Sequence, residues 1–265
     1  MVHARGCRVI PVEAATNGPV TLDAWGQIEG TVFASGQPLP KARVNVGFQS
    51  PAYGVDDLRI GFDFNTVADD RGRFQFTHVP PGQHWVQRVA APRGELSGPT
   101  GMSHGEAVTV VPGETSTVVL GGRGRPVVGR LVLSRPLPGY DWNMDLPVLV
   151  QERPDLKEPP FPGHPQSVDS RTHVQQSLAL DTYQLAHRKS YLSVEPDGTF
   201  RADSVQPGTY SLQVMVRSFP AAPPAEEWEW NRPLLGGRFY PVVVPDDNSS
   251  DALDLGRIVV PLTAP

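Results

Sequence analysis

Two turn sequences that each occur twice, in the same order, are the feature that most restricts how this chain can fold. A turn containing Asp and Gly, called the Asp-Gly turn below, appears in Asp70-Arg71-Gly72 and in Pro196-Asp197-Gly198. A Pro-Gly turn follows in Pro81-Gly82 and Pro207-Gly208, and its glycine lies ten residues after the glycine of the first turn in both copies. Asp hydrogen-bonds to its own backbone, Gly supplies the positive φ that closes a hairpin, and Pro-Gly fits the centre of a type II turn. The repeat therefore predicts two copies of one β-hairpin unit.

The segments around these turns alternate apolar and polar residues, which is typical of strands with one buried face. Phe74 and Phe76 lie two residues apart, so both face the same side of the first predicted strand, and Phe200 repeats the first of them. The strand after the second Pro-Gly turn carries a clean apolar face, made of Tyr210, Leu212, Val214 and Val216.

The residue pattern of two segments does not predict which face is buried or which element forms. After the first Pro-Gly turn, neither the face of His84 and Val86 nor that of Trp85 and Val89 is cleanly apolar, so the inward register of residues 84–90 stays open. The segment Val174–His187 fits neither the helical nor the strand period, and it could be a short helix or an irregular insertion.

Composition excludes several classes of protein. Glycine and proline are abundant, with 26 and 29 residues, but no Gly-X-Y period is present, so the composition favours short strands and turns over collagen or long helices. A net charge of −5 argues against nucleic acid as a partner, and the single cysteine excludes a disulfide framework. No apolar run is long enough for a membrane span, and the N-terminus lacks the apolar core of a secretory signal.

The motifs taken together resemble the carboxypeptidase regulatory-like domain. Its Gly-x-Pro-Leu-x-x-Ala-x-Val turn matches residues 36–44, and its Asp-x-x-Gly-x-Phe and Val-Pro-Pro-Gly elements match residues 69–74 and 79–82. The second copy matches at its first strand and again from Val194 onward. The linker Leu120–Arg130 is similar to linkers of multi-module proteins of planctomycete and verrucomicrobial type.

This resemblance implies an all-β chain of two tandem prealbumin-like (transthyretin-like) Greek-key β-sandwiches. The expected boundaries are 27–121 for the first and 125–261 for the second, which would carry an insertion at 151–187, while residues 1–26 would be the tail of a preceding module or an N-terminal extension. The resemblance also implies an extracytoplasmic location, periplasmic or at the cell surface, and other domains of a larger parent protein as partners.

No catalytic or cofactor signature accompanies the fold. The chain lacks a Gly-x-Ser-x-Gly elbow, and its seven histidines show no close metal-ligand spacing. It also lacks the site motifs of two enzyme families with a prealbumin-like core, the hydroxyisourate hydrolases and the intradiol dioxygenases. We expect that the chain is not an enzyme and binds neither a cofactor nor a metal. The weaker alternatives are a metal site formed by His78 and His84 and calcium binding by the oxygen-rich loop 246–251.

Cys7 is expected to lie in a frayed N-terminus.

Three tryptophans provide the one candidate ligand site. Trp228 and Trp230 lie two apart in a Glu-Trp-Glu-Trp segment, and Trp142 lies in a similar loop of the same predicted module. Exposed rings beside carboxylates suit stacking against sugars, whereas buried rings would simply cap the end of a sandwich. The sequence thus predicts a non-catalytic scaffold or interaction module, with binding of polysaccharide or peptide through exposed tryptophans as the alternative.

Overall fold

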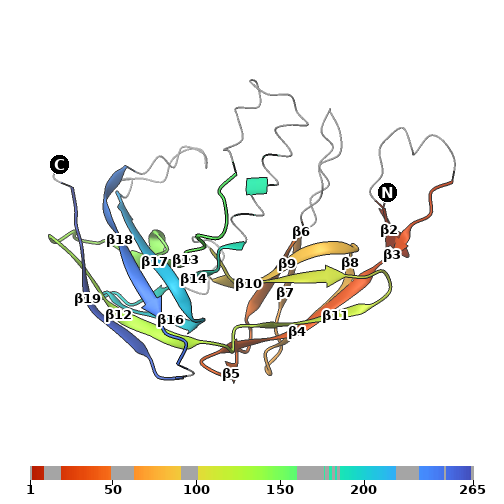
Figure 1. Ribbon diagram of the computed structural model, residues 1–265, viewed down its shortest axis with the longest axis horizontal. Helices are drawn as coiled ribbons and strands as arrows, with labels where there is room; N and C mark the ends of the chain where they lie inside the picture. Colours follow the sequence, from red (N-terminus) through yellow and green to blue (C-terminus); the bar gives the residue numbers. More distant parts are fainter. Residues whose placement is uncertain are drawn as a thin grey trace.

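The computed structural model describes residues 2–8, 19–48, 63–90, 101–159, 187–218, 233–247 and 249–263, together with Gln176, Ala179, Leu180, Tyr183 and Ala186. Strands dominate it (Figure 1). The five separately described residues between 176 and 186 are helical, within the segment for which the sequence left a short helix open. No helix in the described part of the chain is long and apolar enough to cross a membrane.

The first sandwich is built from two facing sheets. Its strands are β4 (Gly26–Ala34), β5 (Gln37–Pro38), β6 (Arg43–Phe48), β7 (Asp63–Val67), β8 (Arg73–Val79), β9 (Gly82–Ala90), β10 (Gly101–Val110) and β11 (Thr115–Leu120). One sheet has the order β11-β4-β5, with β8 also paired to β4, and the other has the order β10-β9-β6-β7.

The second sandwich repeats this topology. Its elements are β12 (Arg125–Leu133), the short 3-10 helix η1 (Trp142–Met144), β13 (Val148–Gln151), β14 (Lys189–Tyr191), β15 (Ser193–Val194), β16 (Thr199–Val205), β17 (Gly208–Arg217), β18 (Leu234–Val244) and β19 (Leu253–Val260). The sheet orders are β15-β16-β12-β19 and β14-β13-β17-β18. In each sandwich the first and last strands pair in parallel, β4 with β11 and β12 with β19.

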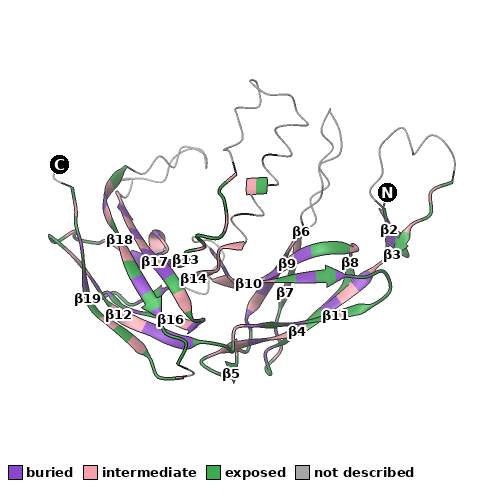
Figure 2. Cartoon of the chain, viewed as in Figure 1, coloured by how far each residue is buried: buried purple, intermediate pink, exposed green. Residues whose placement is uncertain are grey.

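Two separate hydrophobic cores lie between the sheets (Figure 2). The buried members of one core fall between Ile28 and Leu120, and those of the other between Val127 and Val260. The predicted face of Tyr210, Leu212, Val214 and Val216 is buried, with each side chain at most 1% exposed. The fold class is confirmed: the chain is all-β and forms two tandem β-sandwiches.

The repeated turns have the same backbone hydrogen bonds in both copies. Asp69 N donates to Arg73 O at 2.8 Å, and Glu195 N donates to Thr199 O at 2.8 Å. The side chains differ, because the carboxylate that caps the first turn belongs to Asp69 rather than Asp70, while Asp197 caps the second. The two turns therefore share the glycine and the backbone hydrogen bond that closes the hairpin. They differ in the position of the residue whose carboxylate caps the turn.

A glycine opposite a phenylalanine also recurs in the two copies. Gly30 pairs with Phe74 and Gly129 pairs with Phe200 across the strands that follow the turns. A Cβ at Gly30 would lie 2.6 Å from the Phe74 ring, and one at Gly129 would lie 2.8 Å from the Phe200 ring. Only glycine leaves room for these rings to lie across the first strand of each sandwich.

The register of residues 84–90, left open by the sequence, is decided by His84. His84 and Val86 are fully buried, so their face points into the core. His84 Nε2 lies 2.6 Å from Pro80 O, and at the equivalent position of the second sandwich the Tyr210 hydroxyl donates to Gln206 O at 2.9 Å. Both aromatic side chains hydrogen-bond to the carbonyl four residues earlier, so histidine replaces tyrosine in a conserved geometry within this chain.

The N-terminal residues form a small sheet of β1 (Val2–His3), β2 (Gly6–Cys7) and β3 (Asp23–Ala24). Cys7 lies in the strand β2 and is 4% exposed, so the expectation that it lies in a frayed terminus is wrong. Burial raises the pKa of the Cys7 thiol, which makes it less reactive. The strand β3 begins at Asp23, and residues 20–22 before it are not in a strand.

Candidate functional site at the junction of the sandwiches

Of the three tryptophans predicted as a ligand platform, Trp142 is only 6% exposed. The helix η1 carries it into the second core, where its ring packs edge-on against Tyr140 with the centroids 5.1 Å apart. Of the two readings left open by the sequence, the structure favours the second at this position, because the indole fills space at the end of the sandwich. Trp228 and Trp230 lie outside the described residues.

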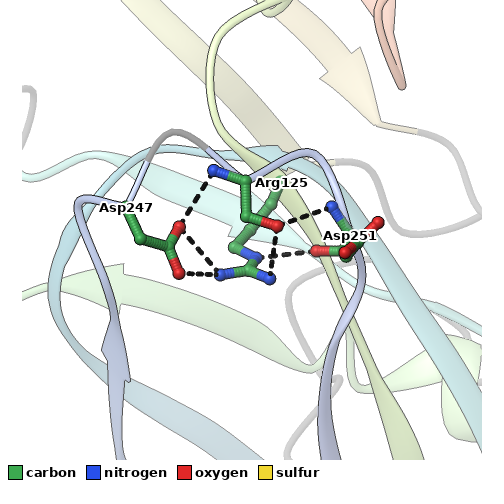
Figure 3. Close-up of polar contacts among 4 residues, drawn as sticks. Arg125, Asp247 and Asp251 are labelled. Carbon is green, nitrogen blue, oxygen red and sulfur yellow. Dashed lines mark hydrogen bonds and ion pairs between the residues drawn. The ribbon is translucent and has the colours of Figure 1, made fainter.

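The oxygen-rich loop at 246–251 encloses a cation that belongs to the protein itself (Figure 3). Arg125, whose side chain is 10% exposed, donates from Nη1 to the Asp247 carboxylate at 3.0 Å and from Nε to Asp251 O at 2.7 Å. Its Nη2 reaches Ser249 Oγ at 3.2 Å. The Ser249 backbone N–H and the Arg125 charge lower the pKa of Asp247. These oxygens already surround a guanidinium, so the arrangement gives no support to calcium binding.

Neither histidine of the proposed His78–His84 pair is placed to hold a metal with the other. His84 is buried against Pro80 O, whereas His78 is exposed and packs edge-on against Trp25. In the part of the chain that the structure describes, no group of three or more His, Cys, Asp or Glu side chains could hold a metal ion.

Among the described residues, a group of polar contacts outside the cores lies where the sandwiches meet. Edge strand β10 of the first lies beside edge strand β14 of the second (Figure 1). Tyr191 N donates to Ser103 Oγ at 3.1 Å, and a side chain at Gly101 would collide with the Tyr191 ring. Arg188 and Glu106 form an ion pair at 3.4 Å. The two edges are thus joined by side chains and do not continue one another's backbone ladder.

His104 occupies the centre of this contact. It has a positive φ of 55° within a β-bulge between Ser103 and Glu106, which turns the side chain toward the second sandwich. Its Nε2 lies 2.9 Å from Asp203 O, and since a carbonyl can only accept, Nε2 carries the proton. Nδ1 is buried and has no hydrogen-bond partner among the described residues.

Burial is the main reason that the pKa of His104 is lowered to about 4. The positive charges of Arg88 and Arg188 lower it further, while the hydrogen bond to Asp203 and the charge of that residue oppose the shift. His104 is therefore neutral at pH 7, and among the described residues no acidic or basic side chain is hydrogen-bonded to its ring.

The other layer of the two sandwiches is joined by a second set of hydrogen bonds. Ser35, in the turn after β4, donates to Asp203 Oδ1 at 2.7 Å and accepts from Arg201 Nη2 at 2.7 Å. Arg201 and Asp203 are themselves paired at 2.7 Å. Nearby, Gly122 N donates to Ser204 Oγ at 3.3 Å. Contacts therefore connect the sandwiches in both layers.

The hollow at this junction is too small to be an active site. It is lined by His104, Glu106, Arg188, Ser204 and Tyr210 among others, and it has room for about one water molecule. His104, Glu106 and Arg188 are committed to a hydrogen bond or an ion pair between the sandwiches, so the geometry supports a structural contact.

Sequence reasoning missed these junction residues. His104 and Asp203 are separated by 99 positions, and neither belongs to a recognisable motif. The one signal was the linker around Gly121–Arg125, whose shortness implies that the two sandwiches must lie close together.

No family model matches the sequence, and no curated protein matches it. Among solved structures, the minor pilin GBS52 of Streptococcus agalactiae is 11% identical, with 91% of this chain and 97% of that chain covered and a TM-score of 0.30. The shaft pilin SpaA of Lactobacillus rhamnosus GG is 10% identical, with 91% and 99% covered and a TM-score of 0.26. The chain spans 34% of the Bacillus anthracis TIE protein, at 11% identity over 90% of this chain and a TM-score of 0.27. Similarity this low carries no argument about function.

Proposed function

We propose that this chain is a non-catalytic scaffold in which two β-sandwiches are held together as one rigid spacer. The observation that carries the proposal is the junction, where hydrogen bonds and an ion pair join the sandwiches in both layers. A flexible tether between independent domains would need none of these contacts.

The linker supports the same proposal. Only residues 121–124 separate β11 from β12. Gly124 has a φ of 93° and lies so close to Val205 O that a side chain there would collide with the backbone. Gly124 is needed because its backbone has a positive φ and packs closely against Val205, so this glycine is not a sign of a flexible linker.

The proposal is tested by the distance between spin labels placed on the two sandwiches, at the exposed positions Thr117 on β11 and Arg257 on β19. We expect one narrow distance distribution at pH 7, measured by pulsed electron paramagnetic resonance. Combining Ser35→Ala with His104→Ala removes contacts from both layers and should broaden it, whereas His78→Ala, which changes an exposed histidine outside the junction, should not. A distribution that is already broad in the unmodified chain contradicts the proposal.

Several expectations from the sequence remain proposals. They are the extracytoplasmic location, the partnership with other domains of a longer protein, and the boundaries 27–121 and 125–261 as independently folding units. The alternative role in polysaccharide or peptide binding now depends on Trp228 and Trp230, because Trp142 is buried. Its test is retention of the chain on insoluble polysaccharides, with the double substitution Trp228→Ala and Trp230→Ala expected to release it if that role is correct.

A further inference from the structure

The contact inside the chain joins two different kinds of sheet edge. Strand β10 closes one side of its sheet, and β18 is its counterpart, since Val110 lies opposite Gly82 as Val244 lies opposite Gly208. Strand β14 closes the opposite side of its own sheet, and β7 is its counterpart, because each precedes an Asp-Gly hairpin. The internal junction is therefore a β10-type edge against a β14-type edge.

One edge of each kind is left over at the outer ends of the pair. Across the junction the order is β7-β6-β9-β10 and then β14-β13-β17-β18, so β7 and β18 are the outermost strands of these two sheets. Among the described residues, β7 pairs only with β6. The first part of β18 is hydrogen-bonded to the short C-terminal segment, at Leu235 and Gly237 and through a bridge between Gly236 and Leu262, and the Arg238 side chain reaches Val259 O on β19. In the described part of the chain, no strand pairs with the outer side of the rest of β18.

Four of the seven exposed large apolar side chains among the described residues lie on these two outer strands, and the other three are Val111, Val119 and Val259. In the described part of the chain, Val67 on β7 is 52% exposed, and Phe239 and Val243 on β18 are 66% and 67% exposed. Leu234, at the start of β18, is 59% exposed. Large apolar side chains at a sheet edge are a feature that proteins usually avoid unless the edge is covered.

Pro241 restricts the kind of cover that fits β18. It lies opposite Ser211 on β17 and has no N–H, so a strand added to the outer edge would lack a hydrogen bond at this point. The internal β10–β14 contact also proceeds without a backbone ladder, through Ser103, Tyr191 and an ion pair. A contact of that kind tolerates a proline.

We propose that a second copy of this chain covers these edges, with β18 of one copy packed side by side against β7 of the next. The occupant follows from continuity with the internal junction, since each copy carries both of the edge types that already meet within the chain. The contact is head to tail, so each copy can bind a further copy at each end, and repeated contacts generate rings or open arrays of copies. The inference rests on the scaffold role proposed above and assigns it a partner.

The test is sedimentation velocity of the full chain over a range of concentrations, with two variants, Phe239→Lys on β18 and Val67→Lys on β7. The matched control is Val119→Lys on β11, because Val119 is 51% exposed but lies on neither outer strand. We expect the unmodified chain and the control to associate as concentration rises. Each of the other two variants alone should weaken association at least tenfold, with an unchanged melting temperature.

Mixing the two variants distinguishes a head-to-tail contact from a symmetric one. Each variant retains one intact edge of the opposite kind, so a mixture should form dimers and nothing larger. Association that survives Val67→Lys but is lost with Phe239→Lys would indicate β18 against β18 and overturn the proposal, and equal loss in the Val119→Lys control would also overturn it. A chain that stays monomeric at about 1 mM overturns it as well, while the narrow label distance within one chain would still stand.

Discussion

Two buried histidines link the structure of single residues to the pH dependence of the whole chain. His84 contacts a backbone carbonyl inside the first core, and His104 donates to one across the junction. Burial lowers the pKa of both below the value of 6.5 that an exposed histidine has. Each is built to stay neutral, and each gives the folded state a disadvantage in acid.

We therefore expect the free energy of unfolding to fall as the pH is lowered from about 6.5 toward 4. Above this window both the folded and the unfolded states are neutral at these positions, and within it only the unfolded chain takes up protons. A shift from 6.5 to about 4 at His104 corresponds to about 3 kcal/mol at the acid end. Urea unfolding at a series of pH values measures this.

The variant His104→Asn isolates the contribution of the junction. Asparagine does not titrate, tolerates a positive φ and keeps an N–H donor, so the pH dependence should become shallower. The matched change His78→Asn, at an exposed position, should leave the slope unchanged. Equal slopes in both variants would show that His104 does not carry the effect.

Trp142 gives a second prediction at the scale of one residue. Because its ring is buried in the second core, Trp142→Ala should destabilise the chain by about 3–5 kcal/mol. The measurement is urea unfolding followed by circular dichroism. A loss below about 1 kcal/mol would mean that the ring does not pack as described.

At the scale of elements, the loop at 246–251 depends on one arginine for its shape. Arg125→Met keeps the apolar stem but leaves the Asp247 carboxylate, Ser249 Oγ and Asp251 O without their shared donor. We expect a loss of about 2 kcal/mol, as for hydrogen bonds to a charged group that is only partly shielded from solvent.

The control on the same strand is Arg130→Met. Its ion pair with Asp197 is 3.7 Å long, and both side chains are more than half exposed, so the change should be close to neutral. Excess calcium chloride or EDTA should leave the melting temperature of the unmodified chain unchanged. Stabilisation by calcium would mean that the loop opens around the metal and would contradict the arginine-centred arrangement.

The elements show why part of the fold could be predicted from the sequence. Asp-Gly and Pro-Gly turns depend on a few neighbouring residues, and the alternation of apolar and polar residues around Tyr210 indicates directly which face is buried. Both features could therefore be predicted from the sequence. The face of His84 could not, because a buried histidine looks polar in a pattern until its hydrogen bond to Pro80 O is seen. The sequence left two readings of Trp142 open, since a tryptophan in a polar loop gives no local sign of whether its ring is buried or exposed.

At the scale of the whole molecule, the two cores are separate and the junction between them is polar. The junction could not be predicted, because its geometry depends on a bulge at His104 and on partners about a hundred positions away. The sequence could predict two similar β-sandwiches, but not the contacts through which one packs against the other.

Separate cores lead to a prediction about the two halves. Residues 27–121 and 125–261, expressed alone, should each unfold in one cooperative transition, because each buries its own apolar face. Each half should melt at a lower temperature than the full chain, since it has lost the junction. Calorimetry measures this, and a missing transition in both halves would mean that the two bodies form a single folding unit.

The parallel pairing of the first and last strands of each sandwich determines how the chain would respond to tension. The chain enters β12 at Arg125 and leaves β19 at Val260, which are opposite ends of one hydrogen-bonded ladder, and β4 with β11 repeats the arrangement. A pull along the polypeptide would load all the bonds of that ladder together in shear, and would not peel them apart one by one. Each sandwich is thus built to resist stretching between its own ends.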